Sequence, residues 1–138
     1  AINLREKDEV VDVILTDNAS DLILTTKLGK ATRFSEKDVN EVGRNSTGVR
    51  GIRLNEKDEV ISINIADDNS SLLTVTEKGF GKKTKISEYP TINRGGKGVI
   101  NIKINEKNGY VTATNAVNEN EEVIIITKKG QVVRVKVN

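Results

Sequence analysis

The sequence repeats itself at an interval of 50 residues. The run LREKDEV at 4–10 returns as LNEKDEV at 54–60 and, in weaker form, as INEKNGY at 104–110. A period of this length is typical of propellers and arrays, in which one supersecondary unit is stacked several times. The sequence therefore predicts a single domain, residues 1–138, built from units of roughly 1–48, 49–98 and 99–138. Both ends fall at unit boundaries, as expected of a piece of a longer array.

Apolar residues alternate with the two-residue period of β-strands. This pattern predicts strands at 11–15, 61–65 and 100–104. Three further segments, 21–26, 72–76 and 123–127, are more fully apolar, and we expect strands buried on both faces there. Each of these segments is followed by a glycine, Gly29, Gly79 or Gly130. Because glycine readily adopts the positive φ of a tight hairpin, we expect a turn at each of them. We expect an all-β fold, with loops 35–47 and 87–97 joining the units.

Composition excludes several classes of function. The chain has no cysteine and no histidine, so disulfides, thiolate chemistry and the commonest general base are absent. We therefore expect no catalytic residues, no metal and no cofactor. No apolar run approaches the length of a membrane span, and no basic segment leading into an apolar run opens the chain, so we expect a cytoplasmic protein.

Charge is segregated along the chain. The net charge is only +2, from 22 basic and 20 acidic residues. Five windows without any acid, 27–33, 44–53, 78–85, 94–103 and 128–136, hold 17 of the 22 basic residues. Acids gather in turns such as 6–9 and 56–59, where they look like solvated surface. The distribution says more about a partner than the net charge does.

Strand alternation directs many of the cations to one side. Arg134 and Lys136 point away from the face of Val133 and Val135, and the same count turns Arg33, Arg53, Lys83, Lys85 and Lys103 outward. A repeated row of Lys and Arg suits a phosphate backbone, which carries one charge per roughly 1.7 Å of duplex axis. The alternative is that these strands only need soluble outer faces.

The loop NRGGKG at 93–98 is the sharpest local motif. Its glycines let the backbone approach a phosphate, and exposed N–H groups there can form an anion nest flanked by Arg94 and Lys97. The alternative is a turn between units in which glycine serves only geometry. No Walker-type phosphate loop is present, so ATP binding is not expected.

These residues resemble a known family. RGGKG at 94–98, TGVRGIRL at 47–54 and GKKTKISEYP at 81–90 are similar to the C-terminal domain of the DNA gyrase A subunit, and the likeness extends over essentially all 138 residues. It is greatest for the later half of that domain. The family's box reads QRRGGKG in the first blade; here Arg94–Gly98 match its last five positions, whereas Ile92 and Asn93 depart from it. We interpret the loop as a related box in a later blade.

The resemblance implies a propeller-like β-pinwheel, here about three four-stranded antiparallel blades. It implies a non-catalytic segment of an ATP-dependent type IIA topoisomerase that binds and wraps double-stranded DNA to support negative supercoiling. The strand-breaking tyrosine lies in another domain of that enzyme, so Tyr89 and Tyr110 are interpreted as structural. Implied partners are the rest of the gyrase A subunit and the gyrase B subunit, in a nucleoid-associated cytoplasmic enzyme. Exposed edges at the two ends would also allow two chains to pair into a six-blade homodimer.

The DNA-binding residues expected on these grounds are basic side chains and loop glycines. They are Arg33, Arg44, Arg50, Arg53, Lys82, Lys83, Lys85, Arg94, Gly95, Gly96, Lys97, Gly98, Lys103, Lys128, Lys129, Arg134 and Lys136. Two other functions stay open. One is the equivalent domain of topoisomerase IV; the other is a propeller-type protein-interaction scaffold, which would need apolar rim patches that two Phe and two Tyr can hardly build.

Overall fold

A computed structural model describes residues 4, 6–17, 19–39, 48–92, 94–119 and 121–136. Over these residues the chain forms three antiparallel sheets, in agreement with the predicted all-β fold, and two short 3₁₀ helices. The first sheet has the order β3-β1-β2-β6, the second β5-β4-β7 and the third β8-β9. Their bounds are β1 Asp21–Thr26, β2 Lys30–Ser35, β3 Val60–Ala66, β4 Ser71–Thr76, β5 Gly81–Lys85, β6 Val99–Ile100, β7 Val111–Val117, β8 Glu122–Ile126 and β9 Val132–Lys136. The helices η1 (Glu36–Asp38) and η2 (Ile86–Glu88) follow β2 and β5.

Each sheet contains a tight hairpin, and the glycine at its turn is the one predicted. β1–β2, β4–β5 and β8–β9 reverse direction at Gly29, Gly79 and Gly130, whose φ angles are +89°, +88° and +90°. Residues with a Cβ rarely adopt such angles. The same hairpin recurs at intervals of 50 and 51 residues.

Neighbouring repeats exchange strands. β3 belongs to the second sequence unit but pairs with β1 of the first, with Leu24 opposite Ile63. In the same way β7 of the third unit pairs with β4 of the second, with Thr74 opposite Thr114. The first and second sheets therefore each take a strand from the unit that follows in sequence, and the first sheet also takes β6 from the third unit. The expected four strands are found only in the first sheet, since the second has three and the third has two in the described part of the chain.

Two of the predicted strands are wrong, and one strand was missed. Residues 11–15 form no strand and pair with none of the described strands. The strand expected at 100–104 ends at Ile100, because the N–H groups of Asn101 and Ile102 both donate to the carbonyl of Gly29 and bend the chain. The third unit places its strand at Val111–Val117 instead.

The core lies between the first and second sheets. Ile23 on β1 and Leu72 on β4 are fully buried, together with Ile86 and Tyr89 after β5. A buried contact joins the hydroxyls of Thr25 and Thr114 at 2.9 Å across the same interface. β1 is buried on both faces as predicted, whereas most side chains of β8 are exposed, so that part of the prediction is wrong. Packing thus weakens toward the third sheet.

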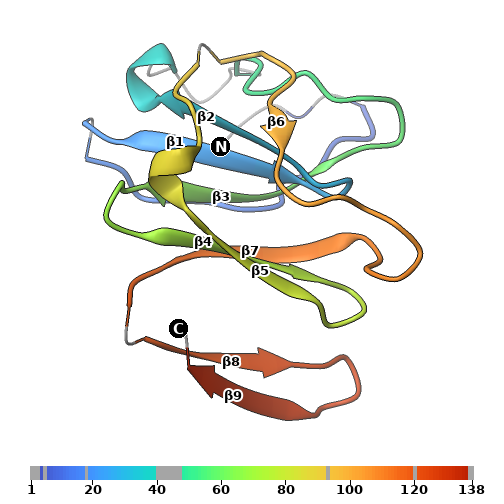
Figure 1. Ribbon diagram of the computed structural model, residues 1–138. Coiled ribbons are helices and arrows are strands. Elements are labelled where there is room, and N and C mark those ends of the chain that lie inside the picture. Colours follow the sequence, from blue (N-terminus) through green and yellow to red (C-terminus); the bar gives the residue numbers. More distant parts are fainter. Residues whose placement is uncertain are drawn as a thin grey trace.

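The three sheets lie one after another, with the second between the first and the third, and they do not close into a ring in the described part of the chain (Figure 1). This arrangement agrees with the expected propeller-like fold. None of the described helices is long and apolar enough to cross a membrane.

Candidate nucleic-acid interface

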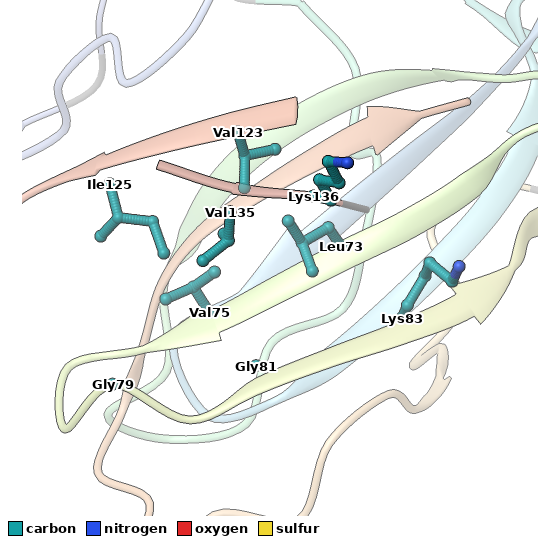
Figure 2. Close-up of a pocket in the computed structure, with 9 residues that line it drawn as sticks. All are labelled: Leu73, Val75, Gly79, Gly81, Lys83, Val123, Ile125, Val135 and Lys136. Carbon is teal, nitrogen blue, oxygen red and sulfur yellow. The ribbon is translucent and has the colours of Figure 1, made fainter. Parts of the chain in front are cut away.

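Three lysines come together where the second and third sheets meet. Lys83 and Lys85 lie two residues apart on β5, the outermost strand of the second sheet, and therefore point to the same face. Lys136 lies on β9, the outer strand of the third. Lys83 and Lys136 both line a hollow of about 320 Å³ between the two sheets, as Figure 2 shows. Lys83 and Lys85 line a second hollow of about 350 Å³ beside it. We call these three residues the lysine cluster.

The three side chains of the lysine cluster are exposed, and no described carboxylate lies close enough to neutralise their charges. Within the described part of the chain, none of its ammonium groups forms an ion pair. Glu88 and Glu119 line the second hollow as well, so the field there is mixed rather than purely positive. Lys83, Lys85 and Lys136 are all exposed.

Arg33 does not belong to the surface, and its predicted outward orientation is wrong. Its residue is only 8% exposed. The guanidinium binds Asp21 at 2.9 Å and Asp68 at 2.7 Å, and it also donates to the carbonyls of Ile86 and Tyr89. Burial disfavours the charge, but the hydrogen bonds to the two carboxylates outweigh it and raise the pKa of Arg33. This cation fastens the first sheet to the second.

Two loops between units meet in the structure. The N–H of Gly95 donates to the carbonyl of Gly51 at 2.8 Å, and the N–H of Arg53 donates to the carbonyl of Gly96 at 2.7 Å. Arg94 reinforces the contact, because its Nε donates to the carbonyl of Asp38 and its NH1 to the carbonyl of Arg50. The pairing brings Arg50 and Arg53 close to the RGGKG loop, a proximity that the sequence analysis did not anticipate.

This pairing changes the expected role of the loop. The N–H of Gly95 is engaged by Gly51, so it is not available for the predicted anion nest. Gly98 has φ +77°, and a Cβ there would lie 2.5 Å from the carbonyl oxygen of Ala31. Glycine is required there for close packing on β2. Lys97 is exposed and remains the cation of this loop that points to solvent.

The other predicted residues divide into engaged and exposed cations. Lys82 donates to the carbonyl of Asn101 at 2.7 Å, and Arg134 forms an ion pair with Glu122 on the neighbouring strand. Exposed cations outside the lysine cluster are Arg50, Arg53, Lys97, Lys103, Lys128 and Lys129. Arg44 lies outside the described residues.

No group of acidic side chains in the described ranges could hold a metal ion. Tyr89 is buried and donates its hydroxyl to Asn101, and burial, although opposed by a hydrogen bond with Thr84, raises its pKa. The ammonium of Lys27 lies over the ring of Tyr110, 4.8 Å from the ring centroid. Both tyrosines have structural contacts, in keeping with the interpretation made from the sequence.

Comparisons with known proteins agree with this architecture. A family model described as DNA gyrase C-terminal domain, beta-propeller, matches residues 1–17, 20–67, 70–118 and 121–138. The DNA gyrase A subunit of Halalkalibacterium halodurans is 52% identical over 52 residues, and that of Klebsiella oxytoca is 47% identical over 53. The DNA topoisomerase 4 A subunit of Bacillus subtilis is 42% identical over 52 residues. Each of these matches covers 38% of this chain and only 6% of the relative.

Two solved structures share the fold over nearly the whole chain. The C-terminal domain of DNA topoisomerase IV superposes with a TM-score of 0.91 at 31% identity, covering 98% of this chain and 42% of that domain. The DNA gyrase A C-terminal domain gives a TM-score of 0.91 at 30% identity, covering 96% of this chain and 46% of that one. Because the family model also matches almost every residue, the chain belongs to the DNA gyrase C-terminal domain family of β-propellers.

Proposed function

We propose that this chain binds the backbone of duplex DNA without sequence preference and wraps it, as part of a type II DNA topoisomerase that introduces negative supercoils. The observation that carries the proposal is the lysine cluster, in which three exposed cations lie on edge strands of two successive sheets and form no ion pair with any described residue. Cations on a strand can reach phosphates, whereas none of the described elements is a helix or ribbon that could enter a groove and read bases. Family membership supports the same function.

In the whole enzyme, the chain would act with the rest of the gyrase A subunit and with the gyrase B subunit. Strand breakage and ATP hydrolysis would belong to those parts, in a nucleoid-associated cytoplasmic complex. The equivalent segment of topoisomerase IV is a second candidate, because the solved topoisomerase IV domain superposes as well as the gyrase one does.

A competing explanation of the lysine cluster is protection of sheet edges. β5 and β9 are outermost strands, and lysine on an edge strand discourages pairing with other chains. The two explanations predict different consequences of removing the charges. Loss of DNA affinity in a soluble protein supports DNA binding, whereas aggregation with unchanged affinity supports edge protection.

The test is the salt dependence of duplex binding, measured by fluorescence anisotropy. Each phosphate contact contributes about −0.9 to the slope of log K against log salt. Lys83→Gln, Lys85→Gln and Lys136→Gln together should therefore weaken binding equally on all sequences and make the slope shallower by nearly three units. The matched control replaces Lys37, Lys57 and Lys107 with Gln, which removes the same charge elsewhere on the exposed surface. Equal effects of the two triple variants, or a salt-independent affinity, would refute the proposal.

A further inference from the structure

The turn that leads into β7 contains the single Asn–Gly pair of the sequence, Asn108–Gly109. It lies at the end of the connection from β6 to β7 (Figure 1). In the corresponding turn before β3, the N–H of Asp58 donates to the carbonyl of Asn55. Here the N–H of Gly109 donates to the carbonyl of Asn105 instead. The turn of the third unit is therefore one residue longer than that of the second.

Position 109 requires glycine. Its φ is +74°, a value that residues with a Cβ rarely adopt. A Cβ there would also lie 2.4 Å from Cγ of Glu77. Glu77 is held in place by Tyr110, because its Oε1 accepts from the N–H of Tyr110 at 3.2 Å and its own N–H donates to the carbonyl of Tyr110 at 2.8 Å. Packing at the strand exchange thus places a glycine directly after Asn108.

An asparagine that is followed by glycine is chemically labile. The backbone nitrogen of the glycine loses its proton and attacks the side-chain carbonyl carbon of the asparagine. The amide takes up a proton and leaves as ammonia, and glycine hinders this attack least because it has no Cβ. Water then opens the five-membered succinimide at either carbonyl and gives aspartate or isoaspartate. In isoaspartate the main chain runs through the former side chain and gains one methylene group.

In the folded chain, hydrogen bonds engage both of the groups that must react. The N–H of Gly109, which has to lose its proton, donates to the carbonyl of Asn105 at 3.0 Å. The side-chain amide of Asn108, which has to leave, donates to the carbonyl of Lys103 at 3.0 Å. The N–H of Asn108 also donates to Oδ1 of Asn105 at 2.9 Å. The turn must therefore open before the succinimide can form.

The residues just after this turn connect the first two sheets. The N–H of Val111 donates to the carbonyl of Lys27 at 3.0 Å, and the ammonium of Lys27 lies over the ring of Tyr110. Tyr110 is in turn bound to Glu77 of the second hairpin. Residues 110 and 111 thus contact the hairpin turns of both sheets. A main chain lengthened immediately before them would displace these contacts.

We propose that Asn108 is a modification site that deamidates spontaneously through a succinimide with Gly109. The reaction proceeds from the opened turn, so its rate reports how often the strand exchange opens at this point. The isoaspartate product weakens the contacts of Tyr110 and Val111 with the two hairpin turns. The aspartate product leaves the length of the main chain unchanged. The modification requires neither an enzyme nor DNA.

Peptide mapping by mass spectrometry measures the reaction. The chain is incubated at mildly alkaline pH, either folded or in urea, and the conversion of each asparagine is followed. In urea Asn108 should react before every other asparagine, and Gly109→Ala should slow it there, where the fold no longer matters. In the folded chain Asn108 should react about thirtyfold more slowly, because two hydrogen bonds of typical strength must open first.

Three results would overturn the proposal. One is a faster reaction at another asparagine in urea. Another is an equal rate for Asn108 in the folded chain and in urea, because the turn would then not control the reaction. The third is a folded chain that remains unconverted at Asn108 over many times the period needed at the thirtyfold slower rate.

Loosening the turn tests whether its opening limits the reaction. Glu77→Ala removes the acceptor of the Tyr110 N–H, so Asn108 of the folded chain should react about fivefold faster, the effect of one lost hydrogen bond. The rate in urea should not change. The matched control is Glu88→Ala, which removes an exposed carboxylate from η2. Equal acceleration by both variants, or none by Glu77→Ala, would show that opening at Tyr110 does not limit the reaction.

The two products separate the effect of charge from that of chain length. Both carry one more negative charge than the starting chain, so ion-exchange chromatography isolates the isoaspartate form, and Asn108→Asp supplies the aspartate form. In the isoaspartate form, the amide of Val111 should exchange with solvent at least about fivefold faster than in Asn108→Asp. The amide of Gly130, which donates to Thr127 in the third hairpin, is the control and should not change. Equal exchange of Val111 in both forms would refute the predicted weakening.

Discussion

At the scale of single residues, the same side chain serves two roles that sequence alone does not separate. Arg33 and Lys83 both occupy strands with alternating patterns, but Arg33 meets two carboxylates and is buried whereas Lys83 meets none in the described structure. Asp68 comes from the following unit, beyond any local pattern. Whether a cation binds a partner or the protein itself is thus decided by residues distant in sequence.

Arg33→Met should destabilise the fold by about 3 kcal/mol, because it leaves the partly buried carboxylate of Asp21 without its cation, with only the hydroxyl of Thr91 as a hydrogen-bond donor. Asp68→Asn is the milder comparison, expected to cost at most about 1 kcal/mol, since the Asp68 side chain is 63% exposed. Urea unfolding gives both values. The DNA affinity of the folded Arg33→Met protein should equal that of the natural chain. A loss of affinity in the folded variant would show that Arg33 contacts DNA.

At the scale of elements, local residues predict the hairpins, whereas no local pattern predicts the strand exchange between units. Gly29, Gly79 and Gly130 mark turns whose geometry depends on adjacent residues, so the sequence identifies them. The strand at 111–117 was missed because TATNA interrupts its apolar pattern, and its position is set by pairing with β4. Residues 11–15 have a better pattern, yet they form no strand.

The candidate site shows the same division. Outward lysines on β5 and β9 follow from two-residue alternation, so Lys83, Lys85 and Lys136 could be predicted. The pairing of residues 50–53 with 94–96 depends on how successive units stack, and no local pattern carries that information.

The two cations of the RGGKG loop should respond differently to replacement. Arg94→Gln removes hydrogen bonds to the carbonyls of Asp38 and Arg50, so it should lower the stability by about 1–2 kcal/mol. Lys97→Gln should leave the melting temperature unchanged and weaken DNA binding more on long duplexes than on short ones, because a loop between blades is needed where the duplex continues. Thermal melts and anisotropy on two duplex lengths measure both. Equal melting temperatures would show that Arg94 does not hold the loops together.

At the scale of the whole molecule, binding and wrapping are separable. Bending a 20–30 bp site by 40–90° costs on the order of 1–6 kcal/mol, so contacts on one sheet alone would leave DNA straight. Wrapping needs cations on successive sheets, as β5 and β9 provide.

Wrapping should change the linking number of DNA circles that are relaxed by a nicking-closing enzyme while the chain is bound. The gel distribution of topoisomers should shift with increasing protein and return toward that of free DNA for the triple Gln variant at Lys83, Lys85 and Lys136. The Gln variant at Lys37, Lys57 and Lys107 is again the control. An unshifted distribution at saturating protein would mean that the chain contacts DNA without wrapping it.

Strand exchange between units also has a consequence for how such arrays lengthen. Because β3 and β7 each complete the sheet before them, sequence unit and blade are out of phase. A duplicated stretch of one period would contribute a strand to the sheet of the preceding unit and would receive a strand from the following unit. This holds wherever in the period the copied stretch begins. Tandem duplication can therefore add a whole blade in one genetic event without passing through an ancestor that carries an orphaned strand.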